Sequence, residues 1–466
     1  MISKKNALLI LNTALKTGSQ YAEIYDEETI TKSVVLSYKR VENLSTNVSS
    51  GIGLRLIKDD KEVYGYTSNL SMKSLLNLAT NLSLAFEGEQ AVEVKEFKAK
   101  RRKLINKIER PFIDEDVSKI IARLKEAEKA GYQVSDSIVN MSVGINNAVK
   151  NVLVLNSDGV MTKDTRSNIR TYVSAVAQNK DGFYGESSYT PGFMGGYEKL
   201  DNIDFVKAAK EAALKAIEKS NASDSPSGTM QVVIGNAFGG TLFHEACGHP
   251  LEADAIAHNR STFVGKIGQK IASDVVTAID DGTIDGAWGS LNFDDEGEVT
   301  TKNVLIKDGV LQNYMVDGFN GKKLGMKSTG ASRRESYRYS PTSRMTNTYI
   351  AAGKSTFDEI ISSVKYGIYC KNFKGGQVDP STNNFNFSSD EVYMIRDGKL
   401  AEMVKPVVLV GYGYDILKKI DMVGDDLALA AGYCGASSGQ VPVQVGQPTV
   451  RISGIIVGGT SKEENV

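Results

Sequence analysis

The chain has 466 residues, with 55 basic and 56 acidic side chains and a formal charge of −1. Its length suggests two or three domains, and its 41% hydrophobic content is that of a globular protein, which excludes a wholly disordered chain. The balanced charge argues against nucleic-acid binding over the whole surface, and no apolar run reaches the length of a transmembrane helix. Three cysteines cannot build the disulfide framework of a small secreted domain. We therefore expect a reducing, cytoplasmic location and no membrane partner.

The first half of the chain predicts helices alternating with β-strands. An amphipathic helix opens the chain, with Leu8, Leu9, Leu11 and Leu15 on its apolar face. Alternating apolar and polar residues then predict strands over 21–69. Further helices are predicted over three segments that each begin with a capping residue, namely 71–86, 116–130 and 204–219.

Residues 93–110 contain a dense run of lysines and arginines. Such a run can bind nucleic acid or an acidic partner, or it can be a solvated connector between subdomains. Because Phe97 is the only aromatic residue among the basic ones, base stacking has no platform here, and we favour the connector. We therefore expect no direct binding of nucleic acid.

The small, polar segment 221–228 is the best candidate for a domain boundary, and most of the 44 glycines lie beyond it. Asp-Gly pairs at 308–309 and 397–398 each separate two β-forming runs, which is typical of hairpins. We predict an α+β fold in two parts, an α+β N-terminal region and a mostly antiparallel, β-rich C-terminal domain. The N-terminal region is divided further, so the predicted subdomains are 1–110, 111–221 and 222–466.

All three histidines lie within residues 244–258, after a predicted strand and a glycine-rich turn. His244, Glu245 and His249 form an HExxxH pattern. A spacing of five residues puts the two imidazoles about 140° apart around a regular α-helix, too far apart for one small ion. We therefore predict a distorted helix, with a π-bulge or a kink, that turns both rings toward the same ion.

Two imidazoles next to a carboxylate are the elements of a hydrolytic zinc site. Zn²⁺ lowers the pKa of a bound water toward about 7, and a neighbouring glutamate can take its proton so that hydroxide attacks a peptide carbonyl. Glu245 occupies the position of that general base. A structural metal site, or buried histidines without a metal, are the alternative interpretations. We favour the catalytic site because histidine is so rare in this chain.

A catalytic zinc ion normally has three protein ligands, and the residues alone leave the third open. Cys247 lies between the two histidines, where a side chain would struggle to point at the same ion. Glu252, Asp254 and His258 follow the motif closely. Cys434 is remote in sequence but lies on a glycine-flanked turn, where a thiolate could approach an ion.

The chain resembles the TldD/PmbA family of peptidases, and specifically its TldD-type subunit. The motifs that carry the resemblance include LFHEACGHPLEAD, RMTNTY and GYCGASSGQVPVQVGQPTVRISGIIVGGT. The resemblance implies a zinc ion bound by His244, His249 and Cys434, with Glu245 as the catalytic base. It also implies an α+β N-terminal part and a β-rich metallopeptidase domain.

The resemblance further implies roles for the remaining residues and for partners. His258 stands where the family needs no histidine, and Cys247 and Cys370 are interpreted as packing residues. The implied assembly is a dimer, either a homodimer or a heterodimer with a TldE/PmbA-like subunit that lacks HExxxH. The implied substrates are unfolded or small peptides in an extended conformation, including leader segments of modified peptides. The alternative is a non-catalytic, dimer-completing or regulatory subunit of the same family.

The group that would stabilise the oxyanion is left open. Arg333, Arg334 and Tyr337 are candidates by residue type. The glycine-rich turn 235–240 could also suggest a phosphate-binding loop, but it lacks the G-K-[ST] ending that such a loop requires.

Overall fold

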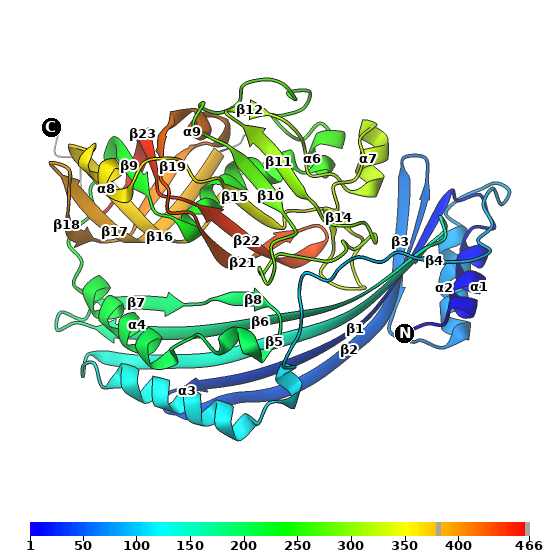
Figure 1. The fold of residues 1–466 in the computed structure, drawn as a ribbon, viewed down its shortest axis with the longest axis horizontal. Helices are drawn as coiled ribbons and strands as arrows, with labels where there is room; N and C mark the ends of the chain where they lie inside the picture. Colours follow the sequence, from blue (N-terminus) through cyan, green and yellow to red (C-terminus); the bar gives the residue numbers. More distant parts are fainter. Residues whose placement is uncertain (379–383, 462–466) are drawn as a thin grey trace.

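The structure, a computed structural model, describes residues 1–378 and 384–461. A long, curved and mostly antiparallel sheet crosses the molecule beneath a β-rich C-terminal half, so the fold is α+β (Figure 1). The sheet has the order β3-β2-β1-β5-β6-β4, with β7 and β8 also paired to β6. Its central strands are β1 (Tyr21–Ser37), β2 (Arg40–Lys58), β5 (Ile138–Asn156) and β6 (Val160–Gln178). Its shorter strands are β3 (Lys61–Thr67), β4 (Lys98–Ala99), β7 (Tyr184–Tyr189) and β8 (Gly192–Met194).

One face of the long sheet is covered by two pairs of helices. At one end lie α1 (Lys4–Ala14) and α2 (Met72–Ser83), and at the other α3 (Val117–Tyr132) and α4 (Phe205–Ser220) (Figure 1). Side chains alternate between the faces of a strand. The even-numbered residues of β1 that pack under the helices, Ile24 at one end and Val34 at the other, are therefore on the same face.

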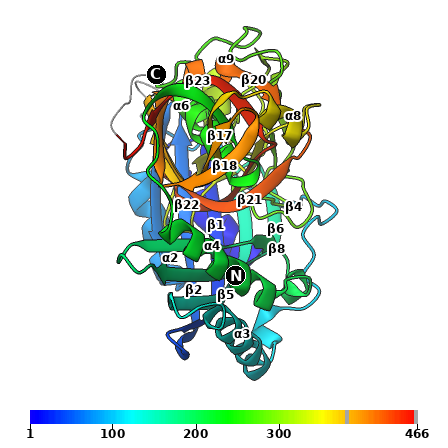
Figure 2. The same ribbon diagram turned by 90° about the vertical axis from the view of Figure 1, so that its left-hand side faces the viewer.

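The opposite face of the long sheet supports the C-terminal half. Its odd-numbered β1 residues include Glu23, Tyr25 and Glu27, all buried. Figure 2 shows the resulting layers, with the β-rich half stacked on the long sheet and α3 on the outer side. The alternation along one strand thus separates an apolar, helix-covered face from a polar face that contacts another part of the chain.

The predicted helices are present, and three begin at the expected caps. Ser71, Asp116 and Asp204 each accept a backbone N–H of the first turn with their side chains. The predicted apolar face of α1 is wrong at Leu9, which is 52% exposed, whereas Ile10 is buried. The buried stripe of α1 begins at Ala7. Leu9, two positions further along, lies about 200° around the helix axis from Ala7 and therefore on the solvent side.

The C-terminal half contains a closed ring of strands around an apolar core. Pairing of β17 with β16 closes the order β16-β9-β23-β19-β17, and β18 and β20 extend it. Alternate side chains fill the interior, among them Val232, Phe387 and Ile452. The strands are β9 (Gly228–Ile234), β16 (Tyr366–Val378), β17 (Asn384–Arg396), β18 (Lys399–Val404), β19 (Val407–Tyr412), β20 (Ile420–Val423) and β23 (Val450–Gly458).

A second C-terminal sheet lies between this ring and the long sheet (Figures 1 and 2). Its order is β12-β11-β10-β15-β22-β21, so β21 is an edge strand. A two-stranded sheet and the helices α6 to α9 complete this half. The strands of the larger sheet are β10 (Ala278–Asp281), β11 (Lys302–Lys307), β12 (Val310–Leu311), β15 (Asn347–Ile350), β21 (Ala428–Ala436) and β22 (Gly439–Gln447). The other elements are β13 (Ser332–Arg333), β14 (Thr342–Ser343), α6 (Ala253–Ala257), α7 (Gly318–Leu324), α8 (Phe357–Ser362) and α9 (Gly413–Lys419).

Both Asp-Gly hairpins are confirmed. Asp308-Gly309 joins β11 to β12 and Asp397-Gly398 joins β17 to β18, and all four residues have positive φ angles. Two consecutive positive φ angles are the signature of a type I′ turn, for which Asp-Gly is a preferred pair.

The basic stretch 93–110 is mostly exposed, and two of its basic residues contact the C-terminal half. Arg102 donates to the carbonyl of Asn292 at 2.7 Å, and Lys100 pairs with Glu298 at 2.6 Å. Two of its basic residues thus contact the C-terminal half, whereas the other lysines and arginines are exposed, which agrees with the expected solvated connector. The division at residue 110 stays a prediction, and strands from both sides of it pair directly in the long sheet, β1 with β5.

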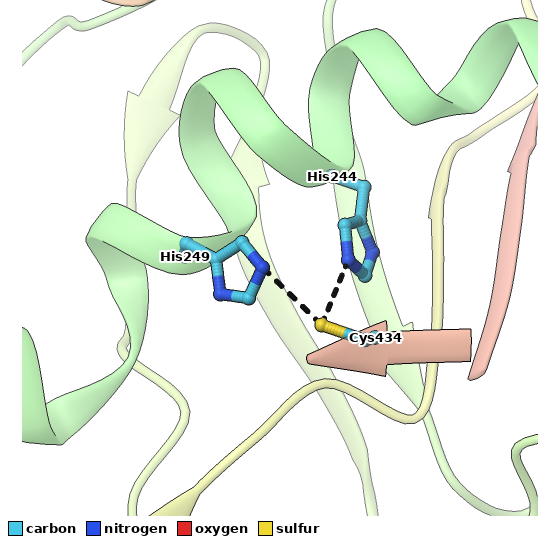
Figure 3. Close-up of side chains that lie close together, drawn as sticks. All are labelled: His244, His249 and Cys434. Atoms are coloured by element: carbon cyan, nitrogen blue, oxygen red, sulfur yellow. Dashed lines mark hydrogen bonds between the residues drawn. The ribbon is translucent and has the colours of Figure 1, made fainter. Parts of the chain in front are cut away.

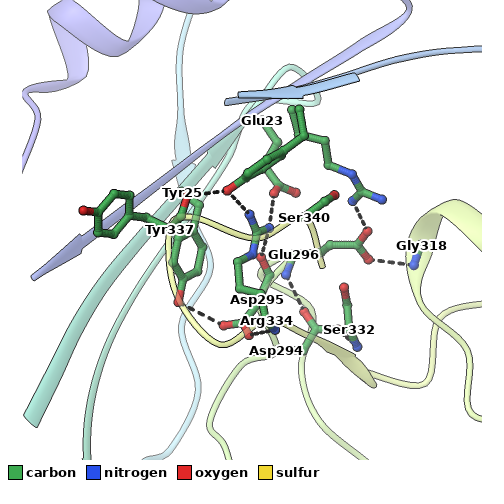
Figure 4. A network of polar contacts seen from close by, with 12 residues as sticks. Glu23, Tyr25, Asp294, Asp295, Glu296, Gly318, Ser332, Arg334, Tyr337 and Ser340 are labelled. Carbon is green, nitrogen blue, oxygen red and sulfur yellow. Dashed lines mark hydrogen bonds and ion pairs between the residues drawn. The ribbon is translucent and has the colours of Figure 1, made fainter. Parts of the chain in front are cut away.

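Buried charged groups connect the long sheet to the C-terminal half (Figure 4). Arg334 pairs with Glu23 of β1, and the Tyr25 hydroxyl donates to Asp295 at 3.3 Å. Arg166 of β6 pairs with the same Asp295. A buried ion pair must recover a large desolvation cost through its hydrogen bonds, so these partners fix one relative placement of the two parts.

Candidate metal centre

The HExxxH segment is a π-helical turn, His244–Gly248, as its spacing predicts. The backbone N–H of His249 donates to the carbonyl of His244, five residues earlier, in place of the i−4 bond of an α-helix. The extra residue brings both imidazoles to one side, with ring centroids 5.1 Å apart. The turn follows the short helices Ala237–Gly240 (η3) and Thr241–Phe243 (α5), and the helix His249–Leu251 (η5) continues it.

Gly240 allows the HExxxH segment to approach the β21–β22 hairpin. A Cβ at this position would lie 2.5 Å from backbone atoms of Gly446 in β22. Only glycine permits this contact without displacement of one of the two backbones. The close approach matters because β21 carries Cys434, which reaches the two histidines from the hairpin.

Three side chains meet at this contact (Figure 3). The Cys434 sulfur lies 3.2 Å from His244 Nε2 and 3.2 Å from His249 Nε2. The three donor atoms all lie within 4.8 Å of one another, and among the residues that the structure describes no other group of three or more His, Cys, Asp or Glu is placed to hold a metal ion. His244 and Cys434 are each 3% exposed and the His249 side chain is 17% exposed, so the cluster is mostly buried and opens on the side of His249.

The charges within the cluster favour a thiolate at Cys434. Burial would raise the pKa of the thiol, but the facing imidazoles of His244 and His249 hold that pKa well below its ordinary value. Burial likewise opposes a charged His249, yet the carboxylate of Glu252 and the sulfur raise the pKa of that imidazole well above its ordinary value. A thiolate is the form of cysteine that binds metals.

Glu245 lies at the more open side of the cluster. Its Oε2 atom is 3.9 Å from His249 Nε2, and its side chain is 22% exposed. The carboxylate is thus beside the three donor atoms but separate from them, where it could exchange a proton with a bound molecule and with solvent.

Two further residues hold the cluster from behind. Glu252 Oε2 lies 3.1 Å from His249 Nδ1. Arg344, fully buried, donates to the backbone carbonyl of Cys434. The sequence suggested Glu252 only as a possible ligand, and it gave no role to Arg344. The only sign of Arg344 in the sequence is that it is the one charged residue of the motif RMTNTY.

The structure places the other candidate ligands outside the cluster. His258 is at the surface, with Nδ1 2.8 Å from the carbonyl of Asp254. Cys247 and Cys370 are buried in the apolar core of the C-terminal half, as packing residues would be. Burial raises the pKa of the Cys370 thiol to about 12, and it raises that of Cys247 as well, so both are neutral thiols at pH 7.

The arginines and the tyrosine named as oxyanion candidates have other partners. Arg334 and Tyr337 belong to the contact with the long sheet, where Arg334 pairs with Glu23 and Tyr337 packs against β1. Arg333 donates to the carbonyl of Met345 at 2.7 Å. These contacts support structural roles for all three residues.

A cavity of about 390 Å³ lies between the β21–β22 hairpin and the long sheet, lined in part by Arg166, Trp288 and Tyr433. Successive side chains of a strand point to opposite faces, so Tyr433 faces this cavity while Cys434 faces the histidines. The cavity is therefore separated from the His/Cys cluster by the hairpin itself.

Family models match most of the chain in three consecutive pieces. They are described as PmbA/TldA metallopeptidase domain 1 at residues 22–85, central domain at 110–219 and C-terminal domain at 227–459. The chain belongs to the PmbA/TldD family. The C-terminal family domain contains the π-helical turn and Cys434, so the whole cluster lies within one of the three matched pieces.

Two relatives in the PmbA/TldD family are similar over nearly the full length, and a third is similar over little more than half of it. A protein of Haemophilus influenzae named a metalloprotease TldD homolog is 36% identical, covering 99% of this chain and 97% of its own. A metalloprotease of Methanothermobacter thermautotrophicus is 32% identical, covering 95% and 96%. A protein of Saccharolobus solfataricus named a zinc metalloprotease TldD homolog is 27% identical, covering 56% and 58%.

Solved structures of low sequence identity share the fold. TldE from Thermococcus kodakarensis superposes with a TM-score of 0.77 at 18% identity, covering 98% of this chain and 99% of its own. A proposed modulator of a DNA gyrase from Thermotoga maritima gives a TM-score of 0.78 at 19% identity, covering 97% and 99%. In the part of the chain that our structure describes, none of the helices combines the length and the apolar character needed to cross a membrane.

Proposed function

We propose that this chain is a zinc metallopeptidase in which His244, His249 and Cys434 hold the ion and Glu245 is the general base. The observation that carries the proposal is the convergence of two imidazoles and a thiol from segments up to 190 residues apart. The names of the relatives support a metalloprotease, and one of those names specifies zinc.

The donor set fits zinc in type and in spacing. Zinc prefers nitrogen and sulfur ligands, and its bond lengths place nitrogen and sulfur about 3.5 Å apart around a tetrahedral ion. The two nitrogen–sulfur distances here are both 3.2 Å. Three protein ligands instead of four are typical of a catalytic site, where one position stays open for water or substrate.

A zinc ion bound there would lower the pKa of a water molecule and polarise a peptide carbonyl. In this proposal Glu245 would take up a proton at its carboxylate beside the bound ion and give it to the departing amine. The burial of His244 and Cys434 limits water on the inner side, so exchange occurs on the side where Glu245 is exposed. The ligands keep their places because a β-hairpin and a π-turn, rather than loops, carry them.

We further propose that the substrates are unfolded or small peptides bound in an extended conformation, for leader-peptide processing or peptide degradation. Backbone hydrogen bonds to a strand edge would hold such a peptide with little dependence on its sequence. The proposed assembly is a dimer of two identical chains or of this chain with a TldE/PmbA-like subunit. The shared fold with TldE supports a related architecture for the two subunits.

The alternative is a non-catalytic subunit that completes a dimer or regulates it. Such a subunit has no need of a ligand set or of a proton-transferring group. The presence of His244, His249, Cys434 and Glu245 together in one place therefore favours the peptidase.

The first test is metal analysis of the purified protein together with an anomalous difference map at the zinc edge. The second is Glu245→Gln, which should retain zinc and lose peptide cleavage by about 10²- to 10⁴-fold, because only proton transfer is removed. Asp254→Asn, a change of a nearby surface carboxylate, is the control and should cleave normally. Full activity of Glu245→Gln would contradict the general-base role, and a wild-type protein without zinc affinity would contradict the proposed function.

A further inference from the structure

The three proposed ligands belong to two separate elements, and one buried arginine contacts both. Arg344 lies between β14 and β15 and has no exposed surface. One terminal nitrogen, Nη2, donates to the carbonyl of Cys434. The other, Nη1, donates to Ser438 Oγ at 2.8 Å and to the carbonyl of Gly439 at 2.9 Å. Arg344 therefore holds both sides of the hairpin turn that carries the sulfur ligand.

Glu252 makes the corresponding contact on the side of the histidines. A carboxylate only accepts hydrogen bonds, so the 3.1 Å contact with His249 requires the proton on Nδ1. This leaves Nε2, the atom that faces Cys434, free to bind a metal ion. Glu252 thus selects the ring form and orientation that ligation needs.

Glu252 and Arg344 face each other through one atom each, and these two atoms make no hydrogen bond elsewhere in the described residues. Glu252 Oε1 and Arg344 Nε are 3.9 Å apart. Both atoms are buried, and neither makes a hydrogen bond with any residue that the structure describes. A buried charge is costly unless it is paired, so each of these atoms depends on the other for compensation.

We propose that Arg344 and Glu252 form a positioning pair that couples Cys434 of the hairpin to His249 of the π-turn. The pair sets the distance between two of the three ligands and so controls zinc affinity, without touching substrate itself. This inference rests on the proposed function. Arginine suits the role because its planar group presents several N–H donors in fixed directions, whereas lysine provides a single mobile charge.

The test is a double-mutant cycle of Arg344→Lys and Glu252→Gln, with zinc affinity measured by competition with a chelator. Each single change should weaken zinc binding by about ten- to a hundredfold, the usual effect of removing a residue that orients a ligand. In the double variant the loss should be smaller than the product of the single losses, because the coupling is already broken. Unchanged affinities, or losses that multiply, would overturn the proposal.

Cobalt substitution gives a second readout, the absorption spectrum of the bound ion, which a general loss of stability would not change. In the folded Arg344→Lys protein, the sulfur-to-cobalt charge-transfer band should shift or weaken, because Cys434 is displaced. A band identical to that of the wild type would count against the pair. Because Glu252→Gln is isosteric, it tests the proposal through the same two measurements if the arginine variant does not fold.

Two matched controls distinguish the effect of this pair from the general effect of changing a buried arginine and from that of removing a nearby negative charge. Arg166→Lys changes another buried arginine, one that pairs with Asp295 at the long sheet, and it should leave zinc affinity unchanged. Asp254→Asn removes a carboxylate two residues from Glu252 and should also bind zinc normally. Failure of the wild-type chain to bind zinc would reject the proposed function, whereas wild-type binding with unaffected variants would reject only the pair.

Discussion

At the scale of single residues, the two histidines of the cluster are held differently. His249 Nδ1 contacts Glu252, whereas His244 Nδ1 is buried with no hydrogen-bond partner in the described part of the chain. Buried ring nitrogens are normally satisfied, and metal-binding histidines usually donate their second N–H to an acceptor. Packing and the contact with Cys434 therefore determine the position of His244. The contact with Cys434 thus matters more for His244 than for His249, which Glu252 also holds.

Replacement of Cys434 tests the ligand set directly. Cys434→Ala should reduce bound zinc to well below one equivalent, since two imidazoles alone form an incomplete catalytic ligand set. Inductively coupled plasma mass spectrometry of the dialysed protein measures the content. His258→Ala should retain zinc, because His258 lies at the surface. If His258→Ala lost zinc while Cys434→Ala kept it, the assignment of the third ligand would be wrong.

The residues of the cluster differ in how far the sequence reveals them. His244, Glu245 and His249 are evident because they are adjacent in sequence and because histidine is rare. Cys434 lies 190 residues from His244, so spacing could not select it, and only the family resemblance pointed to it. The pairing of Glu252 with Arg344 depends on tertiary packing and had no local signal.

At the scale of elements, simple backbone geometry predicts more than amphipathicity does. The five-residue spacing of HExxxH required an irregular helix, and the structure has a π-turn at that place. The Asp-Gly turns follow from the positive φ angles that those residues tolerate. The apolar face of α1 was misjudged because leucine-rich helices offer several possible stripes, and packing against α2 and the long sheet selects one.

The close contact between η3 and β22 gives a prediction at this scale. Gly240→Ala should lower the free energy of unfolding by about 1–3 kcal/mol, because the added methyl group meets the backbone of Gly446. Zinc affinity should fall with it, since the hairpin moves away from the π-turn. Urea unfolding and chelator competition measure the two effects.

The control for this prediction is Gly435, which directly follows Cys434 in the chain. A Cβ at Gly435 would have no atom within 4 Å, and its φ angle is not in the left-handed region. Gly435→Ala should therefore leave stability and zinc affinity nearly unchanged. Equal losses in the two variants would show that the approach of η3 to β22 is not what holds the hairpin in place.

At the scale of the whole molecule, buried charges between the long sheet and the C-terminal half determine how the parts fit. Arg334 and Glu23 are 311 residues apart in sequence, and Tyr25 and Asp295 are 270 apart. No local pattern predicts such pairs, because the sequence around each residue carries no sign of its distant partner. The α+β class was predictable from strands and caps, whereas this packing of one part on the other was not.

Asp295 provides a test of that packing through pH. Burial would raise the pKa of this carboxyl, but Arg166 and Arg334 hold it below its ordinary value. A lowered pKa in the folded state means stability that is present above about pH 4 and is lost as the pH falls further. Asp295→Asn should lower the free energy of unfolding at pH 7 by about 3 kcal/mol. This is the lower end of the range for a broken buried ion pair, because Arg166 still pairs with Asp164 in the variant.

Urea unfolding measured between pH 3 and pH 7 gives the comparison. The wild type should lose stability on the acid side more steeply than Asp295→Asn, because the variant no longer has this carboxylate to protonate. Asp181→Asn, a change at an exposed turn, should follow the wild-type curve. Parallel curves for the wild type and Asp295→Asn would show that the ion pair contributes nothing to acid sensitivity.

The distance in sequence between the histidines and Cys434 has a consequence for the order in which the protein is made. Synthesis runs from the N-terminus, so a nascent chain contains both imidazoles and Glu245 long before residue 434 is added. Until the hairpin is made and pairs with β15, the chain has two of the three proposed ligands and no closed cluster. Under the proposed function, a chain interrupted before residue 434 would lack the sulfur donor and could not complete the zinc site, so peptide hydrolysis would begin only after the hairpin has been made.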